Sequence, residues 1–163
     1  MSTPDRNKMI VGWREWVSLP DLGIKSIKSK MDTGARTSTL HTYFIEQIEA
    51  SEKPMVRFGV HPMQKSDKNG IICTADIIDQ RRIVDSGGHP ELRYIIRTSI
   101  LIGDQKWPID LSLTNREQMR FRLLIGRTAL SDRLIIDPQV SFTLGRPLKK
   151  KRIEKSDEKK TIQ

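Results

Sequence analysis

The chain has 163 residues, enough for one domain with a real hydrophobic core and little more. Its 36% hydrophobic and 30% charged residues are typical of a soluble globular protein, and no apolar run approaches the roughly 18 residues of a membrane-spanning helix. The net charge of +9 does not by itself mark a nucleic-acid-binding domain, because more than half of that charge lies in the last 18 residues.

The compartment is predicted from two further features of the sequence. The start, MSTPDRNKMIVGW, lacks the basic, then apolar, then small-residue order of a signal peptide. Cys73 is the single cysteine, so an internal disulfide is impossible and nothing points to an oxidising compartment. We therefore expect a cytoplasmic protein without a membrane partner.

Strand-forming residues dominate the body of the chain. Ile, Val, Leu, Phe and Thr are concentrated in six segments that turn residues separate. The predicted strands are 55–60, 70–79, 93–103, 106–114, 122–126 and 133–144. Residues 100–113 look like a hairpin with Gly103 and Asp104 in its turn.

Only two segments have the pattern of a helical turn. They are residues 114–122 and 127–133, where Thr114 and Thr128 are candidate caps. The whole pattern predicts a small, all-β and mainly antiparallel domain, closed or sandwiched so that its strand edges are protected.

The C-terminal segment differs in composition from the rest. Residues 146–163 carry eight Lys or Arg against three acidic residues, a net charge of +5, which leaves +4 for the preceding 145 residues. We predict one domain over residues 1–145 and a basic, disordered tail over 146–163. The tail either aids solubility or binds anionic partners such as RNA or acidic proteins. Aromatic residues do not alternate with its basic ones, so nucleic acid is expected as a partner only through the charge of this tail.

Several kinds of site lack their usual sequence marks. His41, His61 and His89 are far apart and do not form an HExxH motif, and Cys73 has no cysteine nearby, so a zinc site has little local support. Nucleotide-binding glycine loops and the GxSxG turn of serine hydrolases are also missing from the sequence. We therefore predict no metal and no cofactor.

Two motifs about ninety residues apart contain the candidate catalytic residues. The first is Met31–Ala35, an apolar residue followed by Asp-Thr-Gly-Ala, and the second is Leu124–Arg127, two apolar residues followed by Gly-Arg. Together, in this order and in a chain rich in strands, they resemble the two active-site motifs of retropepsin-like aspartic proteases. The segments 30–41 and 113–130 resemble more narrowly the small bacterial retropepsin-like family labelled ATP-dependent zinc protease, and the resemblance covers about residues 11–144.

This resemblance implies a fold and a mechanism. The fold would be a closed antiparallel acid-protease barrel with one short C-terminal helix. Asp32 would be the catalytic carboxylate, Thr33 would brace its loop and Gly34 would allow close backbone approach. Two carboxylates about 3 Å apart share one proton, so one acts as base and the other as acid toward a water that attacks the peptide bond. Because the chain has one such motif, the second carboxylate must come from a second copy, in a homodimer with two-fold symmetry.

The resemblance also places a flap between the two motifs. The candidate is residues 81–94, in which Ser86, Gly87 and Gly88 form a mobile tip that covers the bound peptide. A plain hairpin turn is the alternative.

Ala35 and Arg36 are predicted to contact the substrate, and the residues around the first motif suggest an acidic peptide or protein. Arg36 follows Ala35 where retroviral enzymes have an acidic residue, so Arg127 of the second motif lacks its obvious partner and is free to hold an acidic substrate. Further arginines could add contacts, namely Arg81, Arg82, Arg93, Arg97 and Arg116. The resemblance adds genomic neighbours that are glutamate-adding ligases, which favours Glu-rich or polyglutamylated peptides. Two alternatives stay open: a zinc-dependent peptidase, and a non-catalytic module of this fold that binds acidic proteins or RNA.

Overall fold

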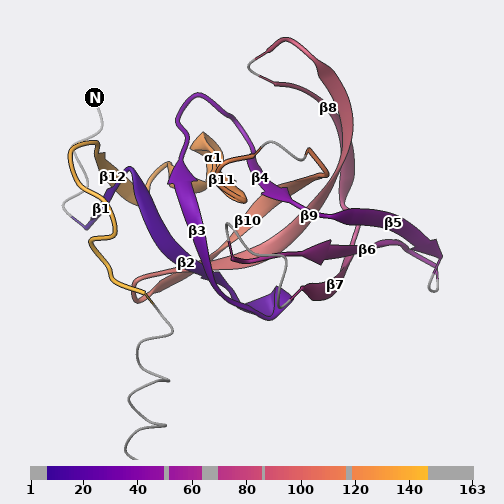
Figure 1. Cartoon of the computed structure of the whole chain (residues 1–163), viewed down its shortest axis with the longest axis horizontal. Coiled ribbons are helices and arrows are strands. Elements are labelled where there is room, and N and C mark those ends of the chain that lie inside the picture. The colour runs from indigo at the N-terminus through magenta and orange to yellow at the C-terminus, as the bar shows by residue number, and fades with distance from the viewer. Residues whose placement is uncertain (1–6, 50–51, 64–69, 86, 117–118, 147–163) are drawn as a thin grey trace, which may run out of the picture.

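The computed structural model describes residues 7–49, 52–63, 70–85, 87–116 and 119–146 (Figure 1). All of the predicted basic tail except Arg146 lies outside these residues, as does Ser86 of the predicted flap tip. No helix within the described ranges is long and apolar enough to cross a membrane.

Strands make up most of the described chain, which confirms the all-β prediction. The strands are β1 (Met9–Gly12), β2 (Arg14–Leu19), β3 (Ile24–Met31), β4 (Ser38–His41), β5 (Phe44–Glu49), β6 (Pro54–Val60), β7 (Ile71–Asp76), β8 (Asp79–Val84), β9 (Pro90–Ile102), β10 (Gln105–Thr114), β11 (Leu123–Ile125) and β12 (Leu134–Asp137). A one-turn 3₁₀ helix, η1 (Pro20–Leu22), and a short α-helix, α1 (Arg127–Leu130), complete the described elements.

The predicted closed antiparallel barrel is confirmed only in part, because most of the described strand pairs are antiparallel but three are parallel. The main sheet has the order β10-β4-β11-β3-β2-β9-β8, and β10 also pairs with β9. Within it, β10 runs parallel to β4 and β11 runs parallel to β3, while β1 and β12 form a separate parallel pair. Closure of the main sheet through β2 and β9 depends on one residue pair, Ser18 with Leu101. The fold is therefore a mixed sheet, accompanied by an antiparallel β5-β6-β7 sheet.

The predicted hairpin over residues 100–113 is confirmed. Strands β9 and β10 pair from Ile102 with Gln105 onward, and Gly103 takes a positive φ of 61°, which a glycine adopts at no steric cost. Alternate residues of both strands point into a core that also receives side chains from β2, β3, β4, β6 and β11. Its largest fully buried members include Leu19, Ile24, Ile27, Leu40, Phe58, Ile96, Ile100, Ile102, Leu111, Leu113 and Leu123.

The predicted helical segments and the last strand differ from the structure. The described part of residues 114–122 contains no helix, and the helix near residue 127 ends at Leu130 and is preceded by Gly126 as its N-cap rather than by Thr128. Strand β12 covers 134–137 only, and residues 138–144 are irregular. This irregular segment is fastened by Glu15, a fully buried side chain whose carboxylate accepts hydrogen bonds from the backbone N–H groups of Gly12, Thr143 and Leu144.

Candidate active site

The two sequence motifs lie side by side in the structure. Strand β3 ends at Met31, immediately before Asp32, and β11 pairs with it in parallel so that Ile125 stands opposite Met31. The backbone N–H of Asp32 donates to the Ile125 carbonyl at 2.8 Å. Strand β11 also pairs with β4, which begins at Ser38, so both ends of the loop 32–37 are held by the second motif.

Backbone contacts fix this loop against the start of α1. The Arg127 N–H donates to the Ala35 carbonyl at 2.7 Å, and the Thr128 hydroxyl donates to the Arg36 carbonyl at 2.9 Å. A Cβ on Gly126 would lie 2.7 Å from the carbonyl carbon of Thr37, closer than any side chain can approach. Glycine is therefore required at position 126 for the two segments to cross this closely.

Arg127 finds a partner that the sequence did not indicate. Its Nη1 donates to the backbone carbonyl of Thr33 at 2.9 Å, so the guanidinium holds the loop 32–37 in place without an acidic side chain. Arg127 is not among the residues that line the cleft described below. Its predicted contact with substrate remains a prediction.

The carboxylate of Asp32 is oriented by its own loop. Its Oδ1 accepts the Gly34 N–H at 3.1 Å, and its carbonyl accepts the Ala35 N–H at 3.2 Å. A Cβ on Gly34 would stand 3.2 Å from the same Oδ1, which is tighter than ordinary contact. Asp32 is half-buried, so its carboxylate can meet both the loop and a ligand.

A cleft of about 750 Å³ lies between this loop and the hairpin of β8 and β9. Its lining residues are Asp32, Gly34, Ala35, Arg36, Thr37, Thr39, Arg81, Arg82, Ile83, Val84, Asp85, Arg93, Arg116, Met119 and Leu124. Five are arginines and two are aspartates, so the lining carries a net positive charge. The predicted residues Asp32, Gly34, Ala35 and Arg36 meet here, whereas Thr33 lies beside the cleft without lining it.

The segment predicted as a flap is a β-hairpin. Strands β8 and β9 pair antiparallel from Asp79 with Ile95 to Val84 with Pro90, and the β8 end of the hairpin projects from the body of the molecule in Figure 1. At the described part of its tip, Gly87 and Gly88 are exposed, and Gly88 has a positive φ of 81°. Neither glycine lines the cleft, so their contact with substrate remains a prediction, as does that of Ser86.

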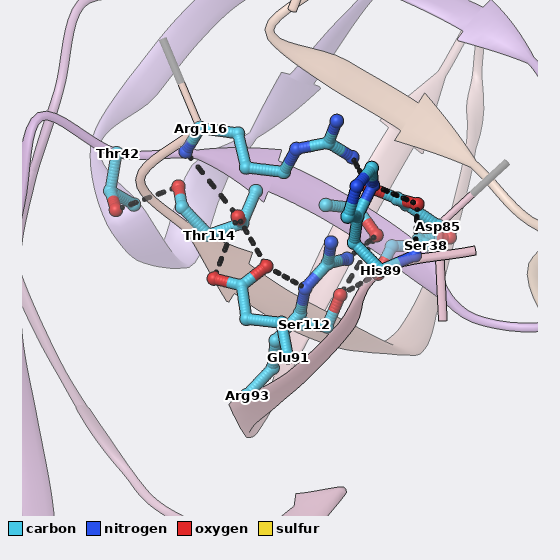
Figure 2. A network of polar contacts seen from close by, with 10 residues as sticks. Ser38, Thr42, Asp85, His89, Glu91, Arg93, Ser112, Thr114 and Arg116 are labelled. Carbon is cyan, nitrogen blue, oxygen red and sulfur yellow. Dashed lines mark hydrogen bonds and ion pairs between the residues drawn. The ribbon is translucent and has the colours of Figure 1, made fainter. Parts of the chain in front are cut away.

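Asp85 joins the tip of this hairpin to the body of the domain (Figure 2). Its Oδ2 lies 2.8 Å from Nη1 of Arg116, which follows β10, and its Oδ1 accepts the His89 N–H at 2.8 Å. The hydrogen bond from His89 is the main cause that lowers the pKa of Asp85 below its usual value, and the nearby charge of Arg116 adds to it.

A buried polar network runs from the hairpin to Ser38 (Figure 2) and from there to Gly126, where the two motifs cross. The guanidinium of Arg93, 5% exposed, donates to Glu91 at 2.9 Å and to the Thr39 hydroxyl at 3.3 Å. Thr39 bonds to Ser112 at 2.8 Å, Ser112 donates to the Ser38 carbonyl, and the Ser38 hydroxyl accepts the Gly126 N–H at 3.0 Å. Sequence reasoning missed Ser38, Thr39, Glu91 and Ser112, because polar residues on alternating strand positions give no signal that they face inward.

Other predicted or discussed residues lie elsewhere. Arg97 pairs with Asp110 at 3.0 Å and does not line the cleft. Cys73 is buried and donates to the Leu22 carbonyl, and burial raises the pKa of its thiol to about 11. Over the described ranges, the structure brings together no group of three or more His, Cys, Asp or Glu side chains that could hold a metal ion.

Replacing Ser38 tests the link between the network and the crossing. Ser38→Ala removes the acceptor of the buried Gly126 N–H and should lower the free energy of unfolding by about 1–3 kcal/mol in urea denaturation. Ser26→Ala is the matched control, because the Ser26 hydroxyl is buried and has no hydrogen-bond partner within the described part of the chain. Removing this hydroxyl should not lower the free energy of unfolding, because burial of an unpaired hydroxyl is itself unfavourable. Equal losses for the two variants would show that Ser38 has no special role.

The Asp85 contact should respond to acid. Because its pKa in the folded chain is below the ordinary 3.8, the contact stabilises the hairpin tip fully above that value and is lost as the pH falls through the lower, folded pKa. NMR titration of the Gly88 and His89 amides should give a midpoint below 3.8, absent in Asp85→Asn. A midpoint at or above 3.8 would contradict the assigned hydrogen bond and ion pair.

Comparison with known proteins gives a family for most of the chain. Residues 10–147 match the family model described as RimB-like, retropepsin-like aspartic endopeptidase RimB. A crystal structure of Lpg0085, a protein of unknown function from Legionella pneumophila, superimposes with a TM-score of 0.71 and 29% identity, and the match covers 83% of this chain and 98% of that one.

Curated relatives carry a different name. Proteins from Shewanella pealeana and Shewanella halifaxensis are each 42% identical over 139 residues, or 85% of this chain, and one from Desulfotalea psychrophila is 42% identical over 141 residues, or 86%. All three are named probable alpha-L-glutamate ligase. In each case the matched segment is 30% of the relative, so this chain corresponds to less than a third of their length.

Proposed function

Because the chain belongs to the RimB-like family of retropepsin-like aspartic endopeptidases, we propose that it hydrolyses peptide bonds with Asp32 as its catalytic carboxylate. The observation that carries this proposal is the loop of Asp32, held by Ile125 and Arg127 of the second motif at the floor of a cleft. The cleft has a hairpin on its other side, where a peptide could be enclosed between the two.

The second carboxylate of the mechanism has to come from a second copy. In the described lining of the cleft, the other carboxylate is Asp85, and it is already paired with Arg116 at 2.8 Å. In a two-fold homodimer, Asp32 of each copy would approach the axis and the pair would share one proton. Exposed Ile10 and Ile135, neighbours on the β1 and β12 pair, offer apolar surface that such a dimer could cover.

Under this proposal each group has a task in hydrolysis. The ionised Asp32 of one copy takes a proton from a water, whose oxygen attacks the peptide carbonyl carbon, while the protonated partner gives its proton to the carbonyl oxygen. The tetrahedral intermediate then collapses: the C–N bond breaks, the first Asp32 gives its newly gained proton to the amine nitrogen, and the partner takes a proton back from a hydroxyl of the intermediate, which restores the shared proton. The Gly34 N–H donates to Asp32 and keeps one carboxylate oxygen in place through these steps. Arg127 acts on the loop through the Thr33 carbonyl and is a positioning residue.

The charge of the cleft supports an acidic peptide as substrate. Arg36 and Arg82 are exposed in the lining, and neither side chain has a hydrogen bond or ion pair to another described residue. Both guanidinium groups are therefore available for carboxylates of a ligand. The curated relatives named for glutamate ligation point to the same amino acid. A glutamate-rich or polyglutamylated peptide would fit both observations.

The mechanism is tested by peptide cleavage with Asp32→Asn from about pH 3 to pH 8, with and without EDTA. Activity should fall about a thousand-fold or more in Asp32→Asn and should survive EDTA in the wild type, since Asn cannot exchange a proton with water. Asp104→Asn, a matched change in the exposed turn between β9 and β10, should cleave as the wild type does.

Other results of this experiment would support the alternatives. Activity that EDTA abolishes and zinc restores would contradict the aspartic mechanism and favour a zinc-dependent peptidase. An Asp32→Asn chain that keeps its affinity for acidic proteins or RNA, in a wild type that cleaves nothing, would favour a non-catalytic binding module.

Substrate charge is tested with two peptides that differ only in Glu or Gln. Cleavage of the Glu peptide should have a kcat/KM roughly tenfold or more above that of the Gln peptide at low salt. The difference should shrink as ionic strength rises, because exposed arginines are screened. Equal kcat/KM values for the two peptides would contradict the acidic preference.

A further inference from the structure

We propose that Arg116 is the residue that binds a glutamate side-chain carboxylate of the substrate, and that Asp85 of the hairpin occupies this site until the substrate displaces it. The inference rests on the proposed function, because it assigns one subsite within the same cleft. It makes Arg116 a determinant of specificity and makes Asp85 an internal competitor of the substrate.

The position of Arg116 suits a binding site. It follows β10, and its backbone N–H donates to the hydroxyl of Thr114, a fully buried residue that also bonds to Glu91. The backbone at this point is therefore anchored to the body of the domain, while the side chain is 48% exposed and lines the cleft. Because the backbone of Arg116 is anchored and its guanidinium reaches the cleft, it can bind a carboxylate without a change in the backbone.

The guanidinium of Arg116 already forms an ion pair with the carboxylate of Asp85. Although Asp85 lies next to the exposed tip of the hairpin, its side chain is only 7% exposed, because the carboxylate points into the cleft toward Arg116 (Figure 2). The O···N distance of 2.8 Å is that of a charge-assisted hydrogen bond. A carboxylate held in this way shows which chemical group the position accepts.

The other arginines of the cleft are arranged differently. Arg93 is buried and paired with Glu91, its neighbour on β9. Arg81 is paired with Asp79 of its own strand at 2.8 Å and also lies 3.6 Å from Asp110 of β10. Arg36 and Arg82 are exposed and have no such partner within the described chain. Arg116 differs from all four because its acidic partner comes from the hairpin tip while Arg116 itself belongs to the body.

Exchange of one carboxylate for another at Arg116 conserves the ion pair. A substrate glutamate would replace the Asp85–Arg116 contact with an equivalent one, and Asp85 would keep the His89 N–H as a donor. The exchange also couples recognition to the hairpin, since a substrate that takes Arg116 releases the tip from the body. Neutral peptides would leave Asp85 in place and meet a cleft that stays closed at this point.

Binding measured without cleavage separates this inference from the proposed function. The probes are hexaglutamate and hexaglutamine, titrated by calorimetry into the full chain carrying Asp32→Asn. Adding Asp85→Asn should tighten hexaglutamate binding about fivefold, because a competitor is removed, and should leave hexaglutamine binding unchanged. Asn still offers an oxygen to the His89 N–H, so the turn at the tip should be preserved.

Arg116 supplies the second arm of the experiment. Arg116→Gln should weaken hexaglutamate binding about tenfold, and in that background Asp85→Asn should have no further effect. Arg116→Lys keeps the charge on a side chain with different geometry. Its affinity for hexaglutamate should lie between that of the chain with Arg116 intact and that of Arg116→Gln. Glu46→Gln is the matched control for net charge, because it breaks an exposed Arg57–Glu46 pair on β5 and β6, which do not contribute to the cleft lining, and it should not change binding.

Several outcomes would overturn the inference. Unchanged or weaker hexaglutamate binding in Asp85→Asn, a gain that persists in Arg116→Gln, or equal changes for both peptides would each show that the pair only positions the hairpin. Absence of hexaglutamate binding in every variant would also contradict it. Wild-type protein that binds as described but cleaves no peptide would instead contradict the proposed function and leave the subsite standing.

Discussion

The position of Asp32 depends on the close crossing of two backbone segments. The loop 32–37 and residues 125–128 exchange backbone hydrogen bonds, and the distance between them leaves no room for a side chain at Gly126. This contact explains why the position of the loop 32–37 depends on two short motifs that are far apart in sequence. It also explains the role of Arg127, which stabilises the loop through the Thr33 carbonyl rather than through an acidic side chain.

The arginines of the cleft fall into two groups, one buried in the protein and one exposed to the cleft. The buried Arg93 belongs to a network that extends through Thr39 and Ser112 to Ser38 at the crossing, so it connects the hairpin to the loop 32–37. The exposed arginines and Arg116 face the space where a peptide would lie. Under the proposed function, these exposed guanidinium groups would favour acidic over neutral peptides by charge.

The sequence predicted structure correctly where short motifs require particular residue types at particular positions. The Asp-Thr-Gly and Ile-Gly-Arg motifs predicted the loop and its partner, the β8–β9 hairpin was placed between them, and the Gly103-Asp104 turn was located correctly. The first five strands were missed as strands because polar and charged residues dilute them, as Lys25 and Lys30 do on the solvent face of β3. Parallel pairing of β11 with β3 and of β10 with β4 depends on contacts distant in sequence, so strand composition could not reveal it. The same holds for Asp85 and Arg116, whose pairing requires the hairpin to fold over the end of β10.

The central claim is that one Asp32 from each of two copies completes the active site, and a mixing experiment tests it most directly. Wild-type chain is equilibrated with increasing amounts of Asp32→Asn chain, and cleavage of a glutamate-rich peptide is measured per wild-type chain. A shared dyad predicts that this activity falls to about half at equal amounts of the two chains, because half of the wild-type chains then sit in mixed dimers with a single carboxylate. Activity per wild-type chain that stays constant at every ratio would contradict the shared site.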